Sequence, residues 1–167
     1  MQVTIRKAKA GDEEILAYIQ TSSWKTAFAD ILDAEVLSKL TDFDRTVNMY
    51  RRVLSANNLN GYILSFDEKP HCIAYWGDAR DEENRGKAEL ICIHSLPENW
   101  HKGYGSKMME VVLEDIRNTA EYREVVLWVF KDNTRAREFY ESKGFEPTSI
   151  SRKTYDTEEM LYTMKIG

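Results

Sequence analysis

The stretch between residues 88 and 130 constrains the fold more than any other part of the chain. It contains two short apolar runs, residues 88–94 and 125–130, whose β-branched and aromatic side chains are typical of buried strands. Between them, a segment that opens at Gly103 predicts an amphipathic helix of about four turns. A strand, a helix and a second buried strand predict a right-handed crossover unit. The helix is indicated by apolar residues at spacings of three and four, namely Met108, Met109, Val112, Leu113 and Ile116.

The chain before this unit is expected to supply a strand, helices and a hairpin. Residues 3–7 alternate between apolar and polar side chains, as a half-buried strand does, and a helical pattern follows. A second helical region runs unevenly to about residue 54, with internal breaks that the pattern does not place. Residues 61–66 and 71–76 flank the turn-like segment 67–70, which predicts two antiparallel strands.

The chain after this unit is expected to add one helix and two strands. Asn133 or Asp132 can cap the helix and Gly144 ends it. Final strands are expected near residues 145–151 and 160–166. We therefore expect an α/β (α+β) fold with a central, mixed, mostly antiparallel sheet of about six to seven strands and helices on both faces.

Length and charge narrow the possible classes of protein. The 167 residues contain no linker, repeat or low-complexity segment, so we expect one domain, residues 1–167. With 23 Lys+Arg against 28 Asp+Glu, the net charge of -5 gives a nucleic-acid backbone no general reason to bind. The start of the chain has no signal-peptide core, and no apolar run approaches the roughly 18 residues of a membrane span. We expect a cytoplasmic protein with no membrane partner.

The cysteines and histidines predict no metal centre and no disulfide framework. Cys72 and Cys92 each lie in an apolar stretch and are expected to be buried thiols. The three histidines are scattered, without the pairing that a metal site needs. The side chain of one of them, His94, is expected to point outward from the end of its strand.

The turn at residues 102–106 is a candidate anion site. The N–H groups of a helix's first turn lack intrahelical acceptors, and the helix dipole adds partial positive charge there. Glycines at 103 and 105 would let an anion approach the backbone. This signal alone also fits an ordinary tight turn. A dinucleotide fingerprint is disfavoured because its third glycine is missing, and no Walker Gly-Lys-Ser or Gly-Lys-Thr is present.

A second block makes the assignment specific. Residues 133–145 read Asn-x-x-Ala-x-x-Phe-Tyr-x-x-x-Gly-Phe, and the turn reads Trp100-x-x-Gly103-x-Gly105. Together they resemble the GNAT superfamily of N-acetyltransferases, closely so over about residues 88–145. Residues 23–28 resemble the bacterial polyamine-type, small-molecule branch. Trp100 stands where this family usually has Gln or Arg, so one side-chain contact to the phosphates is expected to differ while the backbone cradle stays.

The resemblance implies acetyl-coenzyme A (acetyl-CoA) as cosubstrate, with no metal. Its diphosphate is expected on the turn, with two side chains flanking it. The pantetheine arm is expected to pair with the backbone at the end of the first buried strand and to be contacted from the other side by the second block. The implied cofactor-binding residues are Ile93, His94, Ser95, Trp100, His101, Lys102, Gly103, Tyr104, Gly105, Ser106, Asn133 and Tyr140.

The resemblance also implies direct acetyl transfer to a primary amine. Tyr140 is the candidate general acid for the departing thiolate, because a phenol stays protonated at neutral pH. Glu89 is the candidate general base, at a position where several family branches carry a catalytic glutamate. The alternative for Glu89 is a strand residue that faces solvent or pairs with a lysine, in which case another carboxylate or water alone removes the proton. A backbone N–H near Ile93 or His94 would meet the oxyanion.

Two questions stay open at this level. The acidic net charge favours a small cationic amine over a protein as acceptor, without identifying it. The alternative function is a non-catalytic acyl-CoA-binding regulatory module that keeps the cradle without turnover. Dimers are common for the fold that the resemblance implies, so a homodimer is also left open.

Overall fold

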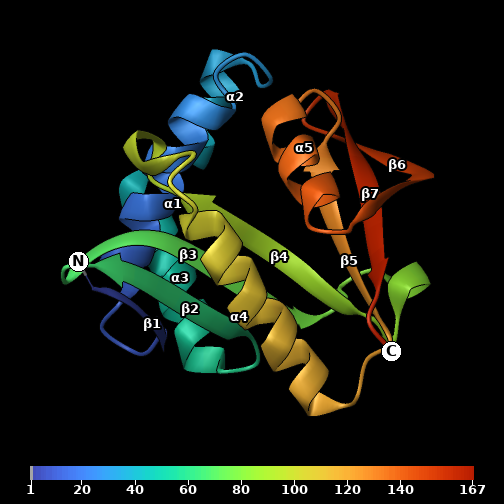
Figure 1. Cartoon of the computed structure of the whole chain (residues 1–167). Coiled ribbons are helices and arrows are strands. Elements are labelled where there is room, and N and C mark those ends of the chain that lie inside the picture. The colour runs from blue at the N-terminus through green and yellow to red at the C-terminus, as the bar shows by residue number, and fades with distance from the viewer. Residues whose placement is uncertain (1) are drawn as a thin grey trace.

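Seven strands form one sheet in the order β1-β2-β3-β4-β5-β7-β6 (Figure 1). The computed structural model describes residues 2–167. Neighbouring strands are antiparallel except β4 and β5, which are parallel. The expected mixed, mostly antiparallel sheet is therefore confirmed. The strands are β1 (Val3–Lys7), β2 (Asn60–Phe66), β3 (Lys69–Asp78), β4 (Ala88–Ser95), β5 (Glu124–Phe130), β6 (Glu146–Thr154) and β7 (Thr157–Lys165).

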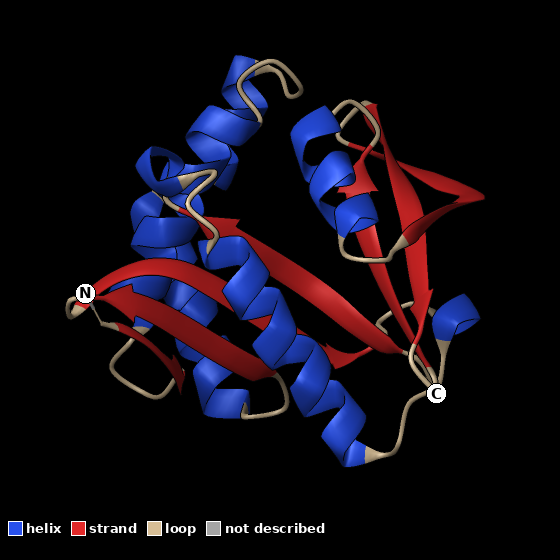
Figure 2. Cartoon of the chain, in the orientation of Figure 1, coloured by secondary structure: helices blue, strands red, loops and turns tan. Residues whose placement is uncertain are grey.

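Helices cover both faces of this sheet, as expected (Figure 2). One apolar cluster joins α1 and α3 to β2 and β3, through residues such as Leu16, Tyr50 and Ile73. A second cluster joins α4 to the opposite face, with Met108 and Ile116 fully buried against the strands. The helices are α1 (Glu13–Ala27), α2 (Ala34–Leu40), α3 (Phe43–Ala56), α4 (Tyr104–Thr119) and α5 (Thr134–Ser142). Two short 3₁₀ turns complete the chain, η1 (Glu82–Asn84) and η2 (Pro97–Asn99).

The two hairpins differ from the predicted boundaries. The β2–β3 turn is Asp67-Glu68 alone, with φ of 48° and 68°, and not the four residues 67–70. Two successive residues with positive φ give the tight turn whose twist matches that of the strands. Pro70 enters β3 next to the register shift between Leu64 and Ser65, where a strand tolerates proline. The β6–β7 hairpin uses the same kind of turn at Tyr155 and makes both strands longer than expected.

A bulge bends β4 away from β5. On β3, Tyr75 faces Cys92 and the next residue, Trp76, faces Leu90, so Ile91 is an extra residue on β4. A bulge bends its strand and increases the local twist. The parallel pairing of β4 with β5 ends one residue before Leu90, at the pair Glu89↔Val126. The remainder of β4 diverges from β5, and the candidate site lies beside this divergence.

Candidate active site

The α4 helix begins beside the end of β4 with its N-terminus uncapped by any side chain. Gly103 occupies the N-cap position with φ of 84°, and no side chain accepts a hydrogen bond from the first turn. A Cβ at Gly103 would meet no atom within 4 Å, so the turn opens onto space. The first-turn N–H groups of an uncapped helix are available to an external acceptor. The backbone of residues 103–106 is therefore open to an external acceptor, and its use as an anion cradle stays a prediction.

Gly105 allows α5 to approach this cradle. A Cβ at this position would lie 3.3 Å from the ring of Phe139 on α5. The glycine therefore brings the two helices together, a packing role that sequence reasoning had not assigned to it. Ser106 lies half-buried in the same first turn.

The loop before α4 rests on the β2–β3 hairpin. Asn99 contacts the imidazole of His71 on β3 through its side-chain amide and accepts a hydrogen bond of 3.3 Å from Lys102. The ring of Tyr104 stacks on the His71 ring at 5.6 Å between centroids. The side chain of Tyr104 thus belongs to the hairpin, and only its backbone can serve the cradle. His101 is exposed, with φ of 66°.

Trp100 joins the end of β4 to α5. Its Nε1 donates to the carbonyl of Ser95 at 3.0 Å. The guanidinium carbon of Arg135 lies 3.6 Å from the centroid of its ring. Trp100 therefore brings a positive charge from α5 to the loop that precedes the cradle.

Tyr140 is carried by α5 on the side of this junction. Its ring packs edge-on against Phe139 and Phe145, and it joins the core cluster that Ile93 of β4 also contacts. Among residues 2–167 no group hydrogen-bonds its hydroxyl, which is not fully buried. Burial raises the pKa of Tyr140 above its usual value, and the charge of Arg135 offsets a smaller part of this rise. The phenol is therefore protonated at neutral pH, as a proton donor must be.

Glu89 lies at the last residue where β4 pairs with β5, and it is 1% exposed. Its Oε1 accepts from the backbone N–H and the Nε of Arg80 at 3.0 and 3.2 Å. Its Oε2 accepts from a terminal nitrogen of the same arginine at 2.7 Å. Neither the solvent exposure nor the lysine partner of the alternative interpretation is present, because Glu89 is buried and pairs with Arg80.

The side chain of His94 turns towards α1. Its Nε2 accepts a hydrogen bond of 3.0 Å from Nε1 of Trp24, and the two rings meet edge to face. Burial and, to a smaller extent, the charge of Arg135 lower the pKa of His94 to about 4. The expected outward orientation is wrong because Trp24 supplies a donor at this place. With so low a pKa, the imidazole is neutral at neutral pH and accepts from that donor.

Asn133 caps α5, as one of the two predicted alternatives had it. Its side-chain oxygen accepts from the N–H of Ala136 at 3.3 Å. Near this cap, the ring of Phe28, just after α1, contacts Phe130 at the end of β5, with 4.9 Å between centroids. Trp24 extends this aromatic group towards β4.

Sequence reasoning missed three residues of this region. Arg80 lies in a loop without any pattern, so nothing in the sequence links it to Glu89. Asn99 lies just before the turn, and its contact with His71 depends on the hairpin returning beside it. Arg135 lies inside the second motif, two residues after Asn133. This position was the one sequence signal that could have indicated its place beside Trp100.

The sequence resembles an acyl-CoA-dependent transferase, and the structure agrees with this class. Strands β4 and β5 diverge, the N-terminus of α4 is open beside them, and Tyr140 lies next to it. The model of the acetyltransferase (GNAT) family matches residues 15–145, and the chain belongs to this family. It is an acyltransferase. A curated relative, the uncharacterized N-acetyltransferase YuaI of Bacillus subtilis, is 22% identical over 156 residues, which cover 92% of this chain and 85% of that protein.

Solved structures share the whole fold. The PaiA N-acetyltransferase of Thermoplasma acidophilum, in complex with coenzyme A, has a TM-score of 0.79 at 20% identity and covers 99% of this chain and 100% of its own. The acetyltransferase yncA of Salmonella typhimurium, described as putative and solved with acetyl-CoA, has a TM-score of 0.74 at 17% identity, with 98% and 93% covered. The ribosomal-protein-S18-alanine N-acetyltransferase of Escherichia coli has a TM-score of 0.68 at 17% identity, with 99% and 94% covered.

Two kinds of feature are absent from residues 2–167. Within that range no group of three or more His, Cys, Asp or Glu side chains is placed to hold a metal ion. No helix in the described chain has the length and apolar character that crossing a membrane requires.

Proposed function

We propose that this acyltransferase moves the acetyl group of acetyl-CoA to a primary amine by direct attack, with Tyr140 as general acid. The observation that carries the proposal is the hydroxyl of Tyr140, which has no hydrogen-bond partner among residues 2–167, on the helix that packs against the open N-terminus of α4. The hydroxyl of Tyr140 can donate a proton, and the N-terminus of α4 can bind a diphosphate. Residues 1–167 are proposed to act as one domain.

The residues present fit acetyl-CoA. Gly103 leaves the cradle open, and the N–H groups of Tyr104, Gly105 and Ser106 are donors in its first turn. Beyond Glu89 the edge of β4 is unpaired with β5, so its backbone can pair with the amides of a pantetheine arm. Bound acetyl-CoA supplies an activated thioester.

The proton steps fall to Tyr140 and Glu89 in this proposal. Tyr140 keeps its proton because burial raises its pKa, and it can donate that proton to the departing thiolate. Glu89 accepts the proton of the incoming amine, directly or through water. Arg80 holds its carboxylate, and Oε2 accepts one hydrogen bond from this arginine, which leaves a second lone pair on Oε2 for the proton. A small amine is favoured as acceptor, because the net charge of -5 attracts cations.

The experiment is a panel of primary amines incubated with purified protein and acetyl-CoA, with free thiol as the readout. The panel contains polyamines, amino sugars, amino acids and peptides with a free N-terminus or lysine. Amine-dependent thiol release supports the proposal, and the best amine identifies the acceptor class. Thiol release that stays at the amine-free background, in a protein that binds coenzyme A, would favour a regulatory acyl-CoA-binding module instead.

A further inference from the structure

Arg135 is a cation of the site without an acidic partner. Among residues 2–167 no carboxylate forms an ion pair with its guanidinium. Desolvation lowers its pKa, yet an arginine remains charged at neutral pH. A partly desolvated and unpaired guanidinium is suited to an anion from outside the chain.

Trp100 holds this cation in place. The indole is fixed at the end of β4 because its Nε1 donates to the carbonyl of Ser95 at 3.0 Å. Arg135 packs on the ring with 3.6 Å between its Cζ and the ring centroid. Contact with an aromatic face uses the face of the planar guanidinium and leaves the N–H groups along its edge free. The guanidinium of Arg135 is thus held at the Trp100 ring.

The same face of α5 is turned towards the cradle. Arg135 and Phe139 are four residues apart on this helix and therefore lie on one face of it. The Phe139 ring lies 3.3 Å from the position of a Cβ at Gly105, in the first turn of α4. Arg135 lies one helical turn away, against the loop that leads into the cradle. The Trp100–Arg135 contact therefore connects the loop after β4 with the start of α5.

We propose that Arg135, carried on the ring of Trp100, is a positioning residue that binds the diphosphate of acetyl-CoA and closes the cofactor groove over it. This inference rests on the proposed function. The cradle amides hold the diphosphate from one side, and the guanidinium edge holds it from the other. An arginine edge can form two parallel charge-assisted hydrogen bonds to phosphate oxygens, which fixes orientation as well as adding affinity.

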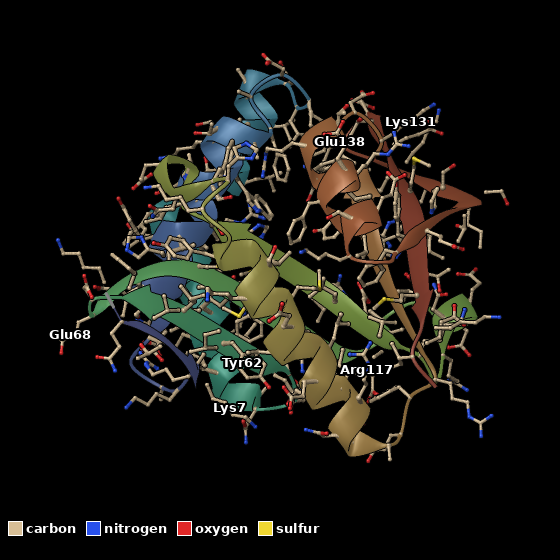
Figure 3. The ribbon with its side chains drawn as sticks, viewed as in Figure 1. Lys7, Tyr62, Glu68, Arg117, Lys131 and Glu138 are labelled. Carbon is tan, nitrogen blue, oxygen red and sulfur yellow. The ribbon has the colours of Figure 1, made fainter. Side chains whose placement is uncertain are left out.

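The test compares Arg135→Gln with Arg117→Gln, which removes the same charge near the C-terminal end of α4 (Figure 3). Calorimetry with coenzyme A measures affinity. Turnover of acetyl-CoA is compared with turnover of S-acetyl-N-acetylcysteamine, a thioester without diphosphate. We expect Arg135→Gln to raise the dissociation constant of coenzyme A about tenfold and to lower kcat/KM for acetyl-CoA about tenfold more than kcat/KM for the truncated thioester. Arg117→Gln is expected to change neither quantity.

The role of the Trp100 ring in holding Arg135 is tested with Trp100→Ala and with the double variant Trp100→Ala/Arg135→Gln. If Arg135 acts from the Trp100 ring, the double variant binds coenzyme A no more weakly than the weaker single variant. Equal affinity of Arg135→Gln and the parent protein would overturn the inference and leave the proposed function standing. An equal loss with the truncated thioester would also overturn it, since the residue would then act at the thiol end. A parent protein that binds no coenzyme A would overturn the proposed function itself.

Discussion

Arg80 holds the buried carboxylate of Glu89 with its backbone N–H and its side chain. Its terminal nitrogen lies 2.7 Å from Oε2, and the side chain of Glu89 is 2% exposed while that of Arg80 is 58% exposed. A carboxylate so deeply buried requires a partner, because an unpaired charge away from water is strongly unfavourable. The loop between β3 and β4 is thereby tied to the strand at the point where β4 and β5 separate.

Removing this partner is expected to destabilise the fold. Arg80→Gln leaves Glu89 with the backbone N–H of residue 80 and one neutral side chain, so we expect a loss of about 3 kcal/mol, at the low end for breaking a buried pair. Urea unfolding measures it. The matched control is Arg85→Gln, whose ion pair with Glu82 is exposed on both sides and should contribute under about 1 kcal/mol. Equal losses in the two variants would show that Glu89 does not depend on Arg80.

Glu89→Gln tests the proton acceptor role separately from the ion pair. The amide keeps one oxygen for Arg80 but cannot take up a proton, so kcat/KM is expected to fall roughly 100-fold with coenzyme A binding retained. The assay is thiol release with the best amine, on protein whose folding is checked by circular dichroism. A folded variant with parental kcat/KM would assign proton removal to another carboxylate or to water.

The fold is expected to lose stability in acid through His94. Its pKa is about 4 in the folded protein and near 6.5 when unfolded, so the unfolded chain binds the proton more readily. The unfolding free energy is therefore highest above pH 6.5 and falls as the pH drops towards 4, by at most about 3 kcal/mol from this group. Urea unfolding at pH 7, 5.5 and 4.5 measures the decline, which should be shallower in His94→Gln. Parallel declines would contradict the assignment.

Asn99 is expected to set the position of the cradle without touching the cofactor. Asn99→Ala removes the links to His71 and Lys102, so the loop before α4 loses its support on the hairpin. We expect coenzyme A to bind about tenfold more weakly, a change of about 1.4 kcal/mol. Asn84→Ala is the control, since its side chain serves the distant η1 turn. The same affinity in both variants would show that the loop holds its shape without Asn99.

Much of the fold was predictable from local patterns. The strand–helix–strand unit has strong periodicity and a glycine where the helix begins, so local preference and tertiary structure agree there. The break between α2 and α3 was not predicted, although Asp42 is the N-cap of α3 and its side chain accepts a hydrogen bond from the N–H of Arg45. The bulge at Ile91 left no signal either, since an extra residue in an apolar strand does not alter the run of apolar letters.

The candidate site was predictable in its backbone and less so in its side chains. Gly103 and the Asn133 cap follow from rules for helix ends, which involve neighbours in sequence. The partners of Glu89 and His94 are Arg80 and Trp24, which come from other elements. Such contacts depend on how the helices and loops pack over the sheet, and a single sequence does not encode that in a local pattern.

The central claim is tested most directly by Tyr140→Phe, measured for both turnover and coenzyme A binding. The variant keeps the ring that packs against Phe139 and Phe145 and removes only the hydroxyl. We predict that kcat for amine-dependent thiol release falls at least roughly 100-fold, while calorimetry shows coenzyme A bound as in the parent protein. Unchanged kcat in the folded variant would contradict the role of Tyr140 as the proton donor.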